Sequence, residues 1–114
     1  QRQMCIRDSC DTVFSKCDAL LTPTMPVVAP RYKDLDVGGG EGMPALVLML
    51  SRNTRPISYL GLPALSVPCG FSSKGLPAAF QLIGRPSSEG KLFRLGNAYQ
   101  NATEWHKTIP QIVK

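Results

Sequence analysis

The chain has 114 residues, of which 43% are hydrophobic and 18% charged, and it contains ten prolines and ten glycines. This length accommodates one domain at most, or a piece of a larger one, and the apolar fraction, close to the globular average, excludes wholesale disorder. The longest apolar run, residues 45–50, is far shorter than the roughly 20 residues that cross a bilayer. No apolar stretch of a secretory signal follows the first arginines. We therefore predict a cytoplasmic protein with no membrane contact.

The net charge of +5 is unevenly distributed, because residues 1–41 carry −1 and residues 42–114 carry +6. A basic half can attract phosphate groups. The lysines and arginines are nevertheless dispersed, and they form no run interleaved with aromatic residues. We therefore do not expect a nucleic-acid partner, and a small basic nucleic-acid-binding module stands only as the alternative from another functional class.

Four cysteines, at positions 5, 10, 17 and 69, include no Cys-x-x-Cys pair, and His106 is the sole histidine. Tetrahedral zinc sites draw their ligands from close pairs of this kind. The sequence therefore predicts no metal site, and nothing in it indicates another cofactor. We expect all four thiols to be reduced and to serve as small apolar side chains.

Residues 1–9 show neither helical periodicity nor turn residues, and residues 4–9 resemble a string that recurs at the ends of reading frames assembled from environmental reads. We interpret this segment as a non-native or disordered arm. The incomplete domain itself then comprises residues 10–114. Its first helix begins near Cys10, because Cys10, Val13 and Phe14 fall at helical spacing.

The next 40 residues alternate between short apolar segments and proline-rich or glycine-rich breaks. Residues 19–22 are typical of a short buried strand that Pro23 ends. Residues 27–42, which include three consecutive glycines at 38–40, predict a long loop. Residues 43–50 are apolar, which predicts a buried helix over residues 43–52.

A second helical turn, β-hairpin strands and a longer helix follow in order. Asn53 and Thr54 are suited to start the helical turn, which extends to Leu60. Residues 64–69 and 78–83 alternate in the manner of strands, so we predict an antiparallel hairpin with residues 72–74 at its turn. We expect the strand at 19–22 to join the same sheet.

The last long element is a helix that Ser87 or Ser88 caps and that places Glu89 in its favourable first turn. Gly90 and Gly96 each weaken it by up to ~1 kcal/mol relative to Ala. Its predicted apolar stripe consists of four residues, Leu92, Leu95, Tyr99 and Ala102.

Few residues are suited to catalysis. The Ser-Ser-Lys triplet at 72–74 suggests a nucleophile with its base, but an exposed lysine keeps a pKa near ~10.4 and is a poor base at neutral pH. His106 has no partner recognisable in the sequence, and the position fits the end of a helix. The triple glycine at 38–40 lacks the spacing of a phosphate-binding loop. We assign no catalytic residue to this chain.

Several ordered motifs resemble the amidase signature family. They comprise residues 18–26, residues 53–71 with the segment Gly-Leu-Pro-Ala-Leu-Ser-Val-Pro-Cys-Gly-Phe, and then residues 75–77, 81–86 and 102–106. The resemblance extends from about residue 10 to residue 110. It implies an α/β fold, of which this chain would be the C-terminal part, with helices packed on a few strands of a mixed sheet.

The resemblance also implies an activity. Members of the family hydrolyse or transfer amides by means of a serine, a second serine joined by a cis peptide bond, and a lysine. These residues lie upstream of the segment that this chain resembles, so none can be assigned here. We expect a C-terminal fragment of a carbon–nitrogen hydrolase that acts on a small-molecule amide. Its oligomeric state is not predicted, and the fragment alone is expected to be inactive.

A related alternative is the A subunit of a glutamine-dependent tRNA amidotransferase. In those subunits the residue before Gly-Leu-Pro is often Asp, suited to binding the amino group of glutamine, whereas Lys74 occupies that position here. A cation does not pair with an ammonium group, so the sequence favours a stand-alone amidase. Polar residues at the ends of buried elements are our candidates for the substrate-pocket wall: Thr22, Thr24, Asn53 and Thr54.

Overall fold

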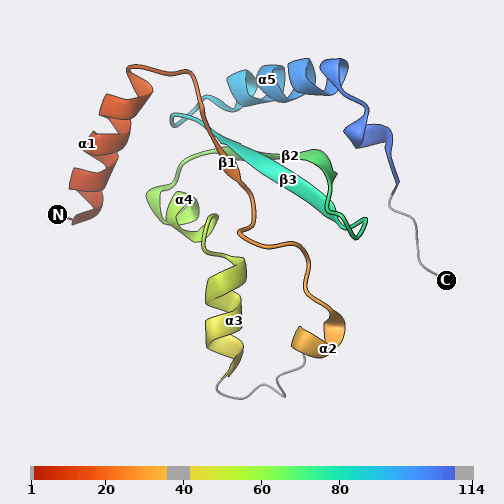
Figure 1. The fold of residues 1–114 in the computed structure, drawn as a ribbon. Coiled ribbons are helices and arrows are strands. Elements are labelled where there is room, and N and C mark those ends of the chain that lie inside the picture. Colours follow the sequence, from red (N-terminus) through yellow and green to blue (C-terminus); the bar gives the residue numbers. More distant parts are fainter. Residues whose placement is uncertain (1, 36–41, 110–114) are drawn as a thin grey trace.

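A computed structural model describes residues 2–35 and 42–109 (Figure 1). Within them, three strands form one antiparallel sheet in the order β1-β3-β2. The strands are β1 (Leu20–Pro23), β2 (Ala64–Phe71) and β3 (Pro77–Ile83). The helices are α1 (Arg2–Phe14), α2 (Tyr32–Leu35), α3 (Gly42–Leu50), α4 (Arg55–Leu60), α5 (Glu89–Ala102) and the 3-10 helix η1 (Trp105–Lys107).

The sheet has the pairing that the sequence predicts. β2 and β3 form a hairpin that pairs Ala64 with Ile83 and Phe71 with Pro77, with a shift of register between Pro68 and Gly70, and β1 pairs with the other edge of β3. Pro23 and Pro68 lie on the two outer strands, where a residue without an N–H donor is tolerated. The α/β class and the hairpin are confirmed. The mixed sheet implied by the resemblance is represented in the described residues by antiparallel pairs.

Helix α5 covers one face of the sheet (Figure 1). Val67, Phe80 and Leu82 project from the strands toward Leu92 of α5, and together they form a buried apolar cluster. Tyr99 meets the ring of Phe80 edge-on, with ring centroids 4.9 Å apart. Strand periodicity on β2 and β3 and helical periodicity on α5 therefore bring their apolar residues to one shared layer.

The buried stripe of α5 differs from the predicted one at its centre. Leu95 is 37% exposed, whereas Gly96 is buried. A Cβ at position 96 would lie 2.7 Å from Cδ2 of Leu65, so the absence of a side chain lets the helix approach β2 closely. Ser88 occupies the N-cap position of α5, as one of the two predicted candidates, but its hydroxyl donates to the Arg85 carbonyl (2.6 Å) and accepts no hydrogen bond from a backbone N–H of the helix.

Helices α1 and α4 contact each other, and α4 lies across the sheet from α5 (Figure 1). Phe14 of α1, Leu60 of α4 and Ile83 of β3 are all buried. Helix α4 ends at Gly61, which adopts a left-handed conformation (φ 66°) that favours glycine. The Arg85 guanidinium donates to the Phe14 carbonyl, and so fastens the end of α1 to the segment after β3.

Helix α1 begins earlier than predicted. It extends from Arg2, whereas we expected residues 1–9 to lack regular structure. Arginine, glutamine and methionine have high intrinsic helix propensity. This propensity favours a helix at the start of the chain even though the segment has no apolar periodicity. Whether residues 1–9 are native stays a prediction.

Helix α3 is present, but its predicted burial is wrong. Four of its apolar side chains are 37% to 54% exposed, namely Met43, Val47, Leu48 and Met49. The helix extends away from the sheet (Figure 1), and none of its residues is buried. An apolar sequence indicates a preference for burial, but burial itself requires a neighbour that the described part of the chain does not supply.

The predicted loop at 27–42 contains the short helix α2. Arg31 forms an ion pair with Asp34 across 2.8 Å, and this hydrogen bond lowers the pKa of the Asp34 carboxyl. The triple glycine at 38–40 lies outside the described residues. None of the helices in the described ranges is long and apolar enough to cross a membrane.

The two glycines of α5 provide a matched test of this packing. Gly90→Ala meets only Arg94 Nη1 at 3.9 Å, so we expect it to raise the free energy of unfolding by about 0.5–1 kcal/mol through helix propensity. Gly96→Ala gains the same propensity but displaces Leu65, and we expect a net loss of stability. Urea unfolding followed by circular dichroism measures both changes. Equal stabilisation by the two variants would contradict the close approach at Gly96.

Candidate functional site

A buried glutamine organises the polar residues at the end of β1. Gln81 lies in the middle of β3 and is 3% exposed. Its side-chain amide donates to Oγ1 of Thr22 (3.0 Å) and to the carbonyl oxygen of Asn53 (2.9 Å). Asn53 in turn donates from Nδ2 to the Pro23 carbonyl (3.0 Å). We call Thr22, Asn53 and Gln81 the polar clamp, because they join β1, β3 and the turn before α4.

The four predicted pocket residues are all half-buried, and the structure brings three of them together near the end of β1. Thr22 and Asn53 meet through Gln81. Thr24 lies just beyond β1, with its Oγ1 3.1 Å from Oγ of Ser66. Thr54 is adjacent to Asn53 in the chain, but its hydroxyl donates to the Ser51 carbonyl (3.3 Å) and makes no cap for α4.

Sequence reasoning missed Gln81 and Ser66. A signal for Gln81 was available, because it is the one polar residue of the strand Pro-Ala-Ala-Phe-Gln-Leu-Ile. A buried polar side chain is stable only when it is hydrogen-bonded, so its partners mark a specific junction. Ser66 carries no such signal, because an alternating strand places polar residues on its exposed face as a rule.

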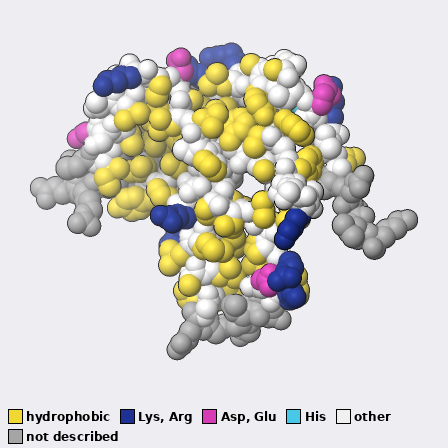
Figure 2. Space-filling model, viewed as in Figure 1, with side chains coloured by type: hydrophobic (Ala, Val, Ile, Leu, Met, Phe, Trp, Pro, Cys, Tyr) yellow, Lys and Arg dark blue, Asp and Glu magenta, His cyan; other side chains and the backbone are white. Residues whose placement is uncertain are grey.

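An apolar groove of about 730 Å³ lies beside Thr24. It is lined by Leu21, residues 23–29, three residues of β2 (Ser66, Pro68 and Cys69), and residues 77–80. These lining residues include no Asp, Glu, Lys, Arg or His. Hydrophobic side chains also gather on the surface of the sheet and of the lobe below it that carries α2 and α3 (Figure 2). The groove can therefore take an uncharged apolar group.

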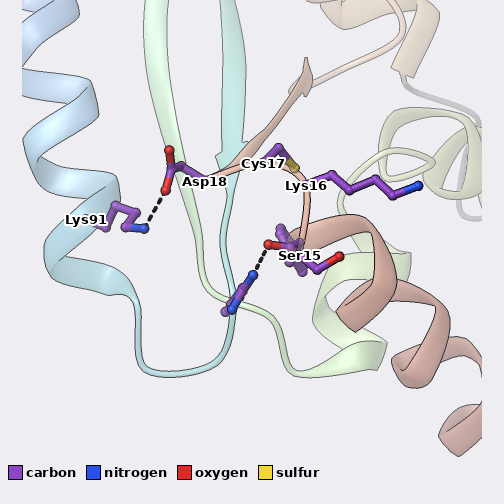
Figure 3. A pocket seen from close by; sticks show the side chains of 7 residues that line it. Ser15, Lys16, Cys17, Asp18 and Lys91 are labelled. Carbon is purple, nitrogen blue, oxygen red and sulfur yellow. Dashed lines mark hydrogen bonds and ion pairs between the residues drawn. The ribbon is translucent and has the colours of Figure 1, made fainter.

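A second, smaller pocket of about 320 Å³ is polar (Figure 3). Lys91 forms an ion pair with Asp18 across 2.7 Å, and this hydrogen bond and the Lys91 charge lower the pKa of Asp18, with a further lowering by Arg85. Arg85 is committed to the Phe14 carbonyl, and Lys16 extends away from the ion pair (Figure 3). Of the three basic residues that line this pocket, Arg85 thus connects the segment after β3 to the end of α1, and Lys91 connects α5 to Asp18 before β1.

Of the remaining nucleophile and base candidates, Ser72 stabilises the hairpin turn. Ser72 Oγ accepts the backbone N–H groups of Lys74 (3.3 Å) and Leu76 (3.2 Å) in the hairpin turn, and Lys74 is exposed. His106 is exposed in η1. Cys10, Cys17 and Cys69 are free thiols, as predicted. In residues 2–35 and 42–109, no three His, Cys, Asp or Glu side chains are grouped so as to hold a metal ion.

The polar clamp makes a prediction for stability. Gln81→Met removes both donated hydrogen bonds and leaves the Asn53 carbonyl without this donor, so we expect a loss of about 1–3 kcal/mol in the free energy of unfolding. Thr22→Val breaks only one of them. Because the two side chains share a bond, the double variant should lose less than the sum of the single losses, by more than about 0.5 kcal/mol. Additive losses in urea unfolding would contradict the Gln81–Thr22 contact.

The sequence of the chain is similar to those of known proteins. The model of the Amidase family matches residues 1–93. The chain is 43% identical over 109 residues to the glutamyl-tRNA(Gln) amidotransferase A subunit of Chloroflexus aggregans, an alignment that covers 96% of this chain and 21% of that protein. The corresponding A subunit of Moorella thermoacetica is 44% identical over 107 residues, 94% of this chain and 21% of that protein.

Solved structures of related proteins have the same fold as this chain over the aligned part. The crystal structure of the glutamyl-tRNA(Gln) amidotransferase A subunit from Thermotoga maritima superposes with a TM-score of 0.66 and 41% identity, over 81% of this chain and 19% of that one. An amidase crystal structure gives a TM-score of 0.66 and 28% identity over 88% of this chain and 23% of that one. The chain spans about a fifth of the length of the relatives that it matches. The family match over most of its residues and the shared fold show that this chain belongs to the Amidase family.

Proposed function

We propose that this chain is the C-terminal, non-catalytic portion of an enzyme that hydrolyses a carbon–nitrogen amide bond, and that it supplies part of the substrate-pocket wall. The observation that carries the proposal is the gathering of Thr22, Thr24 and Asn53 at the end of β1, beside an uncharged groove. Pockets for small molecules typically combine apolar walls with a few fixed polar groups. Thr24 lines the groove, and the polar clamp holds Thr22, two residues earlier in the chain, against β3.

The exposed apolar surface supports a role as part of a larger enzyme. Val47 and Leu48 of α3 are 48% and 54% exposed, and large exposed apolar side chains gathered on one helix are typical of a surface that another polypeptide segment covers. The relatives of the chain are about five times longer. We propose that further polypeptide of the enzyme packs against α3 and carries the serine and lysine residues that the family resemblance implies.

An amidotransferase A subunit is the second candidate, and the names of the relatives favour it. Lys74 argues for hydrolysis instead. It lies exposed in the β2–β3 turn, before Gly75, at the position where the resemblance implies an aspartate in many of those subunits. An ammonium group next to the amino group of glutamine would repel it, so we place hydrolysis of another amide first.

We predict that the purified 114-residue chain hydrolyses no amide above the rate in buffer, including simple aryl amides. Catalysis requires a nucleophile, a base and an oxyanion hole held together, and loss of the whole unit removes nearly all of the rate enhancement. The control is a Ser72→Ala/Ser73→Ala/Lys74→Ala variant in the same colorimetric assay. Turnover by the chain that disappears in this variant would contradict the proposal and would make the turn residues catalytic.

A hybrid enzyme separates the two candidate activities. In it, this chain replaces the matching fifth of the Thermotoga maritima protein. We expect slow glutamine hydrolysis, and we expect Lys74→Asp to raise kcat/KM at least about tenfold, which corresponds to roughly 1.4 kcal/mol, chiefly through KM. Lys74→Asn, which removes the cation without adding an anion, should give a smaller gain. Glutamine hydrolysis by the unmodified hybrid at the rate of the parent protein would instead establish the amidotransferase candidate.

A further inference from the structure

The side-chain amide of Gln81 has one possible orientation. Its nitrogen lies 2.9 Å from the Asn53 carbonyl oxygen and 3.0 Å from Oγ1 of Thr22. A backbone carbonyl can only accept a hydrogen bond, so the NH2 group of the amide must face it. Both hydrogens of that group are used, one by each partner. Because Gln81 is 3% exposed, water does not compete for these bonds, and the amide fixes both partners in direction as well as in place.

The polar clamp leaves hydrogen-bonding capacity on its outer members. Because the NH2 group of Gln81 only donates, Oγ1 of Thr22 accepts, and this bond leaves the Thr22 proton for another partner. Asn53 uses Nδ2 toward the Pro23 carbonyl, a bond that leaves Oδ1 as an acceptor. Both side chains are half-buried and so remain partly accessible from outside the clamp. The clamp therefore presents one donor and one acceptor in fixed directions.

The pairing of the strands does not itself require Gln81. β1 pairs with β3 through the backbone along its four residues, and just beyond it the N–H of Thr24 donates to the Ala79 carbonyl (3.1 Å). A buried polar side chain carries a desolvation cost that its hydrogen bonds must offset, and apolar side chains of the same shape can be equally stable. What Gln81 alone contributes is the direction of the Thr22 hydroxyl and the position of the Asn53 turn.

We infer that Gln81 is a positioning residue for substrate binding, which acts through Thr22 and Asn53 and does not touch the substrate itself. The inference rests on the proposed function, in which Thr22 and Asn53 belong to the wall of the substrate pocket. Groups that bind a substrate gain from a fixed direction, because ordering them in advance removes part of the cost of binding. Loss of Gln81 frees both groups to adopt other directions. It therefore weakens binding and leaves unchanged the chemical step, whose residues the proposed function assigns to further polypeptide.

The test uses the hybrid enzyme with L-glutamine as substrate. Gln81→Met keeps the length of the side chain and removes both donated bonds, and we expect it to raise KM at least about fivefold while kcat stays within about twofold. In the background of Thr22→Val, Gln81→Met should raise KM by a smaller factor, because one of its two routes of action is already lost. Equal factors in the two backgrounds overturn the action through Thr22.

A matched control separates positioning from loss of folded protein. Val67 of β2 is 2% exposed and belongs to the apolar cluster under α5. Val67→Ala removes buried apolar contacts on that face and so destabilises the fold away from the polar clamp. A smaller fraction of folded enzyme lowers the apparent kcat and does not change KM, so we expect an unchanged KM in this variant. If Gln81→Met likewise leaves KM within about twofold of the parent value, the inference is overturned, whatever the change in kcat.

Two further measurements cover the failure of either partner of the test. A hybrid that cleaves neither L-glutamine nor benzamide contradicts the proposed function, and titration calorimetry of both amides then applies the same comparison to Kd. A rise in Kd of at least about fivefold for Gln81→Met but not for Val67→Ala supports the inference, whereas equal Kd values, or no binding to the hybrid, overturn it. If Gln81→Met does not fold, Gln81→Asn replaces it with the same expectation, because its amide is one methylene too short to reach both partners.

Discussion

The central strand β3 is the element on which the rest of the structure depends. It is hydrogen-bonded on both edges, and its neighbours β1 and β2 both contain a proline that restricts them to outer positions. Successive residues of a strand project to opposite faces. Phe80 and Leu82 therefore join the layer under α5, while Gln81 and Ile83 project to the other face, where Gln81 reaches the turn before α4. β3 thus supplies Phe80 and Leu82 to the apolar cluster under α5 and Gln81 to the polar clamp on the other face.

This arrangement explains how the polar residues near the end of β1 are held without a charged network. Gln81 is buried, so its amide must be satisfied within the protein. Its two donated bonds reach a strand and a turn that are 59 and 28 residues away in the sequence. The bonds consequently hold Thr22 and the Asn53 turn in one geometry, and they leave Thr24 to continue into the groove. Packing of α5 on the other face supports the same strand.

Uncharged surface is the common property of the groove and of α3. The described ion pairs, Arg31–Asp34, Asp18–Lys91 and Glu104–Lys107, are exposed and lie away from the lining of the groove. Exposed pairs of this kind contribute little to stability. The basic excess of the second half of the chain is likewise absent from the groove. The groove therefore offers a surrounding polypeptide or ligand only apolar area and hydroxyl groups, and no charge.

The sequence by itself determined the local elements and the family. Alternation over 64–69 and 78–83 and the helical spacing after Ser88 depend on residues close together in the chain, and those elements appear as predicted. It also indicated that Thr22 and Asn53 lie at the ends of elements. Only the tertiary structure decided that Gln81 joins them, that Gly96 and not Leu95 faces the sheet, and that α3 is exposed. Each of these features depends on which segment from elsewhere in the chain packs against the residue concerned. The periodicity of neighbouring residues does not identify that segment.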